Sequence, residues 1–314
     1  MQEHDLRAIA KTNAEYITPI ALRKFLASKI TKDNFTVLEP AIGSGQLLFE
    51  LKDKIAEIDG FDINPTSIEM AKTNFGNKLN AFNQDFITAD INKHYDCAIA
   101  NYPFSLPPTE KQKEFIANDK FLKTFFSKQQ DTNTLIEMED IVKPESVNGK
   151  LDFMFILKSF QHAQEGFYFA FPGIGYRSQE KKFRKYLIEN KFIKEIGMLN
   201  NCKFDHTSIP ILFIHLTKTL NETTKSFTLD FKTNELIESV ATFENNAFDF
   251  PKKEIEKEYF DIVETERQLR KSIIDNLLKD LDFSQKIYNL DPEIRKNLPS
   301  IEEFKNEIIS KLEA

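Results

Sequence analysis

Cysteine and long apolar runs are both scarce in this chain of 314 residues. The only two cysteines, Cys97 and Cys202, lie far apart and without the spacing of metal ligands. Zinc sites and disulfide frameworks are therefore not expected. No stretch reaches the ~20 apolar residues that cross a bilayer, and residues 1–30 contain no apolar run of the signal-peptide type. These absences predict a cytoplasmic protein without a metal or a membrane partner.

Tryptophan is absent, and basic residues are too few to make the chain a strong polyanion binder by itself. The formal net charge is −7. The excess falls entirely on residues 222–314, because residues 1–221 carry equal numbers of acidic and basic side chains. A free-standing nucleic-acid-binding module needs a basic surface, and neither part of the chain provides one. The hydrophobic fraction of 41% is nevertheless enough for an ordinary core.

Short apolar segments alternate with helix-like segments in the first hundred residues. The segments predicted as strands are 35–39, 55–61, 81–85 and 95–100, and those predicted as helices are 46–51 and 65–74. Alternation of this kind predicts an α/β fold, a doubly wound Rossmann-like sheet with parallel strands and right-handed crossovers. Ligands bind such sheets at the carboxyl ends of the strands, and the distinctive residues lie at those ends.

The rest of the chain divides near residue 221. After a polar stretch at 105–150, the pattern predicts a helix from Leu151, a strand at 166–171, a helix at 180–190 and a strand at 209–216. Polarity rises after Lys218, so we place residues 1–221 in one domain. Residues 222–314 form an acidic region that is predicted to be mainly helical. Its apolar positions suit docking on a partner or packing on its own domain.

A turn with two glycines, Glu39-Pro-Ala-Ile-Gly-Ser-Gly45, follows the first predicted strand. Glycines there let a ligand approach the backbone, although glycine turns also close α/β units for structural reasons alone. The spacing fits neither the dinucleotide fingerprint nor the P-loop. A carboxylate at Glu39 would repel phosphate, so it suits a cationic ligand such as the amino group or sulfonium of S-adenosylmethionine.

Two further carboxylates end the second and third predicted strands. Asp62 stands where a carboxylate accepts both ribose hydroxyls in dinucleotide folds, although a solvated helix cap explains it equally well. Asp85 is ambiguous in the same way. Three acidic strand ends in succession favour a nucleoside ligand.

The segment Asn101-Tyr-Pro-Phe104 follows the fourth predicted strand. An exocyclic adenine amine is a poor nucleophile because its lone pair is delocalised into the ring. Two acceptors on its hydrogens would free the lone pair, and Asn101 and the backbone carbonyl of Tyr102 supply them. Phe104 offers a face on which an extruded base can stack, worth ~1–3 kcal/mol.

These segments, in order and spacing, resemble the amino-methylating DNA methyltransferases of the adenine-N6 type. The resemblance covers residues 10–220 and is strongest to modification subunits of type I restriction–modification systems. The motifs that carry it are Tyr16-Ile-Thr-Pro19, Glu39–Gly45, Asp62-Ile63, Asp85-Phe86, Asn101–Phe104, Gly149–Asp152, Pro172–Arg177 and Phe204–Pro210.

The resemblance implies S-adenosylmethionine as the cofactor and adenine N6 in double-stranded DNA as the target. It assigns to the cofactor Tyr16, Thr18, Glu39, Ala41, Gly43, Gly45, Asp62, Ile63, Asp85 and Phe86. It assigns to the catalytic loop Asn101, Tyr102, Pro103 and Phe104, with Phe204 as a second wall against the target base.

Within the cofactor set, the resemblance implies a distinct role for each residue type. Thr18 and Glu39 would hold the methionine end, and the two glycines would make room around it. Asp62 would take the ribose hydroxyls. The adenine would pack on Ile63 and Phe86, and Asp85 would accept its amino group.

Two departures from the family pattern bear on activity and partners. Family members usually have proline where Tyr102 stands, so we expect Tyr102→Pro to preserve or raise activity. The chain also lacks the long helical N-terminal region and any domain able to read sequence, which predicts a separate specificity subunit. The alternatives are a catalytically impaired methyltransferase-like subunit and a protein-glutamine N5-methyltransferase. The basic face of Lys181, Lys182, Arg184 and Lys185 is either solvated or a phosphate contact.

Overall fold

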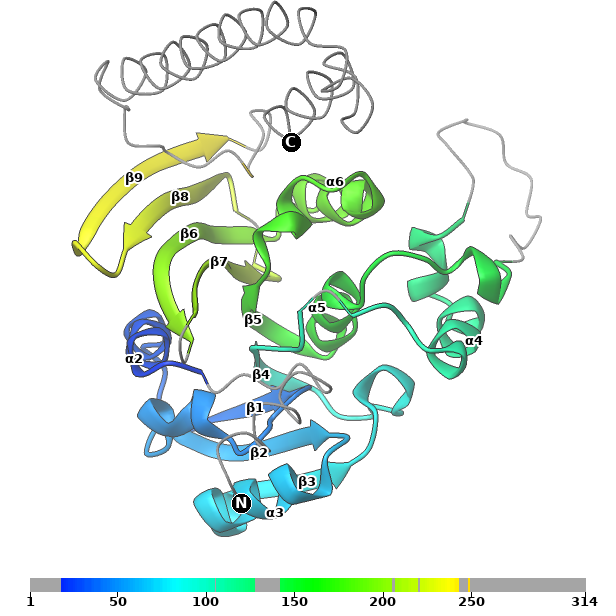
Figure 1. Ribbon diagram of the computed structural model, residues 1–314, viewed down its shortest axis with the longest axis horizontal. Coiled ribbons are helices and arrows are strands. Elements are labelled where there is room, and N and C mark those ends of the chain that lie inside the picture. Colours follow the sequence, from blue (N-terminus) through cyan, green and yellow to red (C-terminus); the bar gives the residue numbers. More distant parts are fainter. Residues whose placement is uncertain are drawn as a thin grey trace, which may run out of the picture. The chain divides into compact units, whose positions relative to one another are not determined.

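The computed structural model describes residues 18–104, 106–127, 142–204, 207–219, 221–242 and 248. The chain divides into two compact units, residues 1–251 and 252–314, and every described element belongs to the first. One sheet of nine strands runs through that unit, in the order β3-β2-β1-β4-β5-β7-β6-β8-β9 (Figure 1). The predicted α/β class with a Rossmann-like sheet is confirmed.

The first five strands are parallel, and the order reverses between β1 and β4. A ligand crevice is expected at that reversal. The antiparallel β7 lies between β5 and β6, β8 is parallel to β6, and β9 closes the edge antiparallel to β8. The strands are β1 Phe35–Glu39, β2 Ile55–Asp62, β3 Leu79–Asn83, β4 Tyr95–Ala100, β5 Ala163–Ala170, β6 Ile193–Phe204, β7 Thr207–Thr217, β8 Thr223–Asp230 and β9 Glu235–Thr242.

Helices cover both faces of the sheet. They are α2 Ile20–Lys29, α3 Pro65–Phe75, α4 Glu110–Asn118, α5 Asp152–Gln161 and α6 Lys181–Glu189. Successive side chains of a strand point to opposite faces. In β4, Ile99 therefore joins the apolar cluster under α2 and α3, whereas Ala98 and Ala100 join the cluster under α5 and α6. Among the helices of the described ranges, none is both long and apolar enough to cross a bilayer.

Local sequence signals fix where the helices begin. Pro65 opens α3, and the side chain of Asn64 caps it by accepting from the backbone N–H of Thr66. Thr109 and Gln112 form a reciprocal capping box that opens α4. This helix lies in the polar stretch at 105–150, for which no helix was predicted. The predicted helix at 46–51 is instead the 3₁₀ helix η1, Gln46–Leu51.

The sheet continues past the predicted boundary at residue 221. β8 pairs with β6, and its Phe227 is buried against Gly197, where a Cβ would lie 2.1 Å from the ring. The first compact unit ends at residue 251, so that boundary was placed too early. The sequence becomes more polar after Lys218 because β9 is an edge strand with many exposed side chains. The predicted helices of residues 252–314 lie outside the described residues.

Candidate active site

The predicted site residues gather at one edge of the sheet. Glu39 ends β1, Asp62 ends β2, and Asn101 directly follows β4. Because these strands are parallel neighbours, their carboxyl ends meet at the same edge. The turn after β5, the 3₁₀ helix η6 (Pro172–Gly175), lies at that edge as well.

The turn after β1 requires both of its glycines, for different reasons. Gly43 and Gly45 have φ values of 53° and 80°, in the region that L side chains avoid. A Cβ on Gly45 would lie 2.5 Å from the ring of Phe75, so this glycine permits close packing with α3. Among the described residues, a Cβ on Gly43 would meet nothing within 4 Å. On the side of Gly43, the described part of the chain therefore leaves the backbone open to a ligand.

Glu39 places a buried carboxyl group at the end of β1. Its side chain is 1% exposed, and Oε2 has no hydrogen-bond partner among the described residues. Burial, and then the nearby charge of Asp62, raises the pKa of this carboxyl well above its usual value. A cationic ligand beside Glu39 would lower this pKa again, because its positive charge favours the ionised carboxylate. This orphaned oxygen fits the ammonium group of S-adenosylmethionine.

Asp62 organises the glycine turn. Its Oδ2 accepts from the backbone N–H of Gly43 at 2.8 Å, and its Oδ1 accepts from that of Asn64, also at 2.8 Å. Each carboxylate oxygen can accept more than one hydrogen bond, so these two bonds do not exclude ribose hydroxyls as partners. The next residue, Ile63, is 66% exposed and offers an apolar surface beside the carboxylate.

Asp85 and Phe86 are both engaged by their own protein. Asp85 caps the 3₁₀ helix η3 (Phe86–Thr88) through the N–H of Ile87, and its Oδ2 accepts from Gln112 Nε2 at 3.0 Å. The ring of Phe86 is buried, and it lies nearly parallel to that of Phe155 at 5.9 Å. Contact of either residue with an adenine stays a prediction.

Sequence reasoning missed two residues that hold this segment. Gln112 reaches Asp85 from α4, and the capping box around it was the available signal. Lys158 of α5 is buried, and its Nζ donates to the carbonyls of Ile87 and Ala89 at 2.7 and 2.5 Å. Burial lowers the pKa of Lys158 to about 8, against the opposing charges of nearby aspartates. No sequence pattern indicates that a lysine within an apolar helix donates hydrogen bonds to the backbone of a segment far away in the sequence.

In the loop after β4, the side-chain amide of Asn101 is hydrogen-bonded at its nitrogen but not at its oxygen within the described residues. Nδ2 donates to the hydroxyl of Thr18 at 2.9 Å. Oδ1 is buried and has no hydrogen-bond partner in the described part of the chain. Phe104 is half-buried and packs against both apolar clusters. The free oxygen of Asn101 is available as an acceptor.

Tyr102 is a core residue as well as a loop residue. Its side chain is 1% exposed, and its ring lies 5.5 Å from that of Phe155 at an interplanar angle of 9°. The hydroxyl is buried without a partner among the described residues, and burial, followed by the charge of Asp152, raises its pKa well above the usual range. Tyr102→Pro was predicted to preserve or raise activity, because it keeps the backbone carbonyl. Proline would also remove this packed ring, so a loss of stability is now expected beside any effect on activity.

A buried ion cluster supports the turn after β5. The Arg177 guanidinium lies 3.1 Å from Asp152 and 2.9 Å from Glu180, and both carboxylates are fully buried. Asp152 begins α5, so the cluster ties that helix to the turn. Both segments were among the predicted motifs, but the ion pair between Arg177 and Asp152 was not predicted.

The remaining predicted residues lie less favourably or outside the described residues. Phe204 ends β6 and is buried in the cluster under α2 and α3, so its role as a wall against a base stays a prediction. Ala41 is half-buried in the glycine turn and Pro103 half-buried in the loop. Tyr16 lies outside the described residues. In the described ranges, no three His, Cys, Asp or Glu side chains group as metal ligands, and both cysteines are buried and free.

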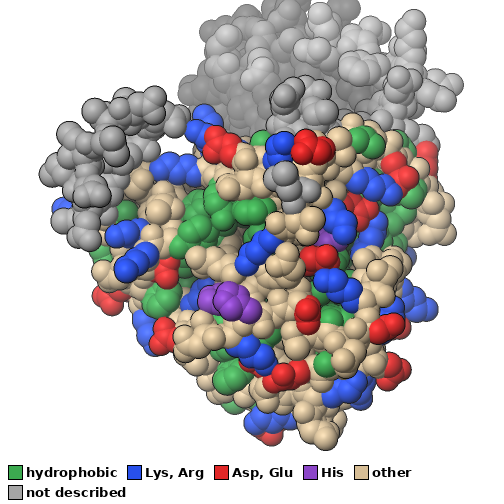
Figure 2. All heavy atoms as spheres, turned by 180° about the vertical axis from the view of Figure 1, so that it is seen from behind, with side chains coloured by type: hydrophobic (Ala, Val, Ile, Leu, Met, Phe, Trp, Pro, Cys, Tyr) green, Lys and Arg blue, Asp and Glu red, His purple; other side chains and the backbone are tan. Residues whose placement is uncertain are grey.

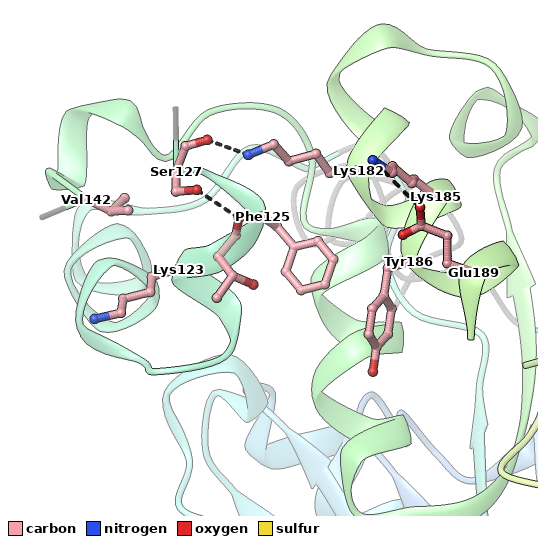
Figure 3. Close-up of a pocket in the computed structure, with 9 residues that line it drawn as sticks. Lys123, Phe125, Ser127, Val142, Lys182, Lys185, Tyr186 and Glu189 are labelled. Atoms are coloured by element: carbon pink, nitrogen blue, oxygen red, sulfur yellow. Dashed lines mark hydrogen bonds and ion pairs between the residues drawn. The ribbon is translucent and has the colours of Figure 1, made fainter. Parts of the chain in front are cut away.

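A separate pocket of about 450 Å³ lies between α6 and the 3₁₀ helix η4, Leu122–Phe125 (Figure 3). Lys123, Lys182 and Lys185 line it, and Lys182 donates to the carbonyl of Ser127. It contains none of the residues predicted to bind the cofactor or to form the catalytic loop, so we do not assign the chemistry to it. Lys182 and Lys185 belong to the basic face for which a phosphate contact was one alternative. On the face shown in Figure 2, basic and acidic side chains are interspersed without an extended basic patch.

Comparison with known proteins identifies the family of this chain. The sequence profile of the family described as N-6 DNA methylase matches residues 4–293. The methylase subunit of the type I restriction enzyme MpnII of Mycoplasma pneumoniae is 27% identical over 253 residues, which cover 70% of this chain and 43% of that protein. The chain therefore spans less than half the length of this curated relative.

Solved structures share the fold. The methyltransferase subunit of a type I restriction–modification system from Streptococcus thermophilus has a TM-score of 0.56 at 20% identity, covering 73% of this chain and 56% of the other. A Listeria monocytogenes protein assigned to the class I S-adenosylmethionine-dependent methyltransferases has a TM-score of 0.50 at 17% identity, with coverages of 68% and 65%. At these identities the likeness is one of fold alone.

Proposed function

Because the chain belongs to the N-6 DNA methylase family, we propose that it methylates adenine N6 in double-stranded DNA, with S-adenosylmethionine as the methyl donor. The observation that carries the proposal is the buried amide oxygen of Asn101, which has no hydrogen-bond partner within the described residues. It lies at the sheet edge where the order of the strands reverses, in the same loop as Phe104.

The protein residues would act on the amine of an extruded adenine. Asn101 Oδ1 and the backbone carbonyl of Tyr102 accept hydrogen bonds from the two amine hydrogens. The nitrogen lone pair is thereby withdrawn from the ring and turned towards the donor. Phe104 stacks on the base and compensates part of the cost of extruding it, which amounts to a few kcal/mol.

The turn after β1 would hold the cofactor, which when bound supplies a methyl group on a positively charged sulfur. Glu39 accepts from the ammonium group, and burial strengthens that pairing because little water competes. Gly43 leaves the backbone open, and Asp62 accepts from the ribose hydroxyls while keeping its bonds to the turn. Ile63 provides an apolar surface for the adenine ring.

We further propose that a separate specificity subunit selects the DNA site. Residues 1–221 are neutral in formal charge, and the excess of −7 lies in residues 222–314. DNA affinity and sequence readout need basic side chains at phosphates and base edges. The Mycoplasma relative is a subunit of a type I restriction enzyme, which supports such an assembly within a restriction–modification system.

The test is methyl transfer from labelled S-adenosylmethionine to DNA, with and without the neighbouring gene products, followed by nucleoside analysis. Asn101→Ala should abolish transfer while leaving the cofactor Kd unchanged in calorimetry. Asp62→Ala is the matched control, and it should weaken cofactor binding at least tenfold, about 1.4 kcal/mol. Full turnover by Asn101→Ala would refute the proposal. A wild type that binds cofactor but never transfers methyl groups would favour the impaired-subunit alternative.

A further inference from the structure

Thr18 and Asn101 are far apart in the sequence but joined by one hydrogen bond. Thr18 Oγ1 accepts from Asn101 Nδ2 at 2.9 Å, and the opposite end of the amide, Oδ1, is buried without a partner in the described ranges. An asparagine side chain can turn over and exchange its donor and acceptor ends. Only one of the two orientations is useful for chemistry on an amine.

The useful orientation is the observed one. With Nδ2 on Thr18, the free end of Asn101 is an acceptor, which attracts the hydrogens of an amine. With the amide reversed, two N–H donors would face an amine that is itself a donor. A target amine would then lose its acceptor and meet repulsion. Catalysis by Asn101 therefore depends on whatever holds its Nδ2 end.

Thr18 is well placed to hold that end. It is buried, and it directly precedes Pro19, which restricts the backbone of both residues. The carbonyl of Pro19 accepts from the N–H of Arg23 at 3.1 Å, which starts α2. That helix is fixed to the sheet through the fully buried side chains of Leu22 and Leu26. The hydroxyl is thus carried by a rigid support outside the catalytic loop.

We propose that Thr18 is a positioning residue for Asn101. Its hydroxyl can accept from the amide nitrogen or donate to the amide oxygen, so it fixes where the side chain lies. In the bonding observed, Nδ2 is the donor, and this leaves the amide oxygen to face the target amine. This inference rests on the proposed methyl transfer, and it differs from the role that the family resemblance implies for Thr18. A residue that only binds the methionine end of the cofactor would change cofactor affinity. A residue that orients Asn101 changes kcat.

Two variants separate these roles. Thr18→Val keeps the shape of the side chain but cannot accept the hydrogen bond, and Thr18→Ser keeps the hydroxyl. Loss of this one hydrogen bond should lower the kcat of Thr18→Val about tenfold. Its cofactor Kd should stay within about threefold of wild type, a difference below 1 kcal/mol. Thr18→Ser should recover most of the lost kcat.

A second readout does not depend on activity. In ¹⁵N-labelled full-length protein, the Asn101 side-chain amide signals are identified by their loss in Asn101→Ala. Hydrogen exchange of these signals should be slow in wild type and Thr18→Ser but fast in Thr18→Val. Unchanged exchange in Thr18→Val would overturn the hydrogen bond. Fast exchange with unchanged kcat, or with only a raised cofactor Kd, would overturn the positioning role. Absence of methyl transfer in the wild type would instead overturn the proposed function, while the exchange measurement would still decide the hydrogen bond.

Discussion

Removal of the Tyr102 hydroxyl should stabilise the protein. This oxygen is buried without a hydrogen-bond partner among the described residues, in a ring that is 1% exposed. A polar group left unsatisfied in a protein interior costs about 1–3 kcal/mol. Tyr102→Phe removes that cost and keeps the contact of the ring with Phe155. We expect the free energy of unfolding to rise by about 1 kcal/mol, the low end of that range.

Tyr168 provides the matched control. It is equally buried, but its hydroxyl lies 3.0 Å from Ser159 Oγ and is hydrogen-bonded. Tyr168→Phe should therefore lower the free energy of unfolding by about 1 kcal/mol. The two substitutions are chemically identical and should have opposite signs.

Urea denaturation and thermal melts of both variants measure the difference. One kcal/mol corresponds to a shift in Tm of about 2–4 °C in a unit of this size. Tyr102→Pro should instead lose about 3–5 kcal/mol, as when an aromatic ring is deleted from a core. Destabilisation by Tyr102→Phe as large as that by Tyr168→Phe would refute the reasoning, because it would reveal a partner for the hydroxyl.

Two further substitutions test the buried polar groups of the site. Burial and Asp62 raise the pKa of Glu39, so its contribution to stability is present at low pH and is lost as the pH rises above about 4.5 towards the folded pKa. Glu39→Gln should remove this pH-dependent loss of stability, and so stabilise the ligand-free protein at neutral pH. The same substitution should weaken S-adenosylmethionine binding more than tenfold, about 1.4 kcal/mol. Melts across a pH series and calorimetry measure these effects, and equal cofactor affinity would contradict the second. Lys158→Met leaves the carbonyls of Ile87 and Ala89 without their donor, and should cost about 2–3 kcal/mol of stability. Urea melts measure this loss, and wild-type stability would show that these hydrogen bonds are unimportant.

The strand ends could be predicted because the signal is local. A strand that ends at a carboxylate or an asparagine brings that residue to the carboxyl edge of the sheet, whatever packs elsewhere, as with Glu39, Asp62 and Asn101. The direction in which a side chain points is not determined by the local sequence. Nothing in the sequence indicates that the ring of Tyr102 points into the core, or that Lys158 reaches the segment after β3.

The later strands were missed or misplaced for a different reason. β6 was not predicted, because its regular alternation is broken between Leu199 and Cys202, where Asn201 adopts a φ of 57°. β8 and β9 were assigned to an appendage because edge strands expose polar side chains and resemble surface segments. In both cases pairing with distant strands decides the structure, and a short sequence window does not contain those partners.

Phe155 joins the two halves of the site in one stack of rings. It lies nearly parallel to Phe86, which was predicted to contact the cofactor adenine, and to Tyr102 in the loop after β4. The two segments therefore cannot be exchanged with those of relatives one at a time. Replacement of Tyr102 with the usual proline leaves a cavity beside Phe155. A second substitution is then needed to fill that cavity. Substitutions at residues 86, 102 and 155 should consequently co-vary among related sequences.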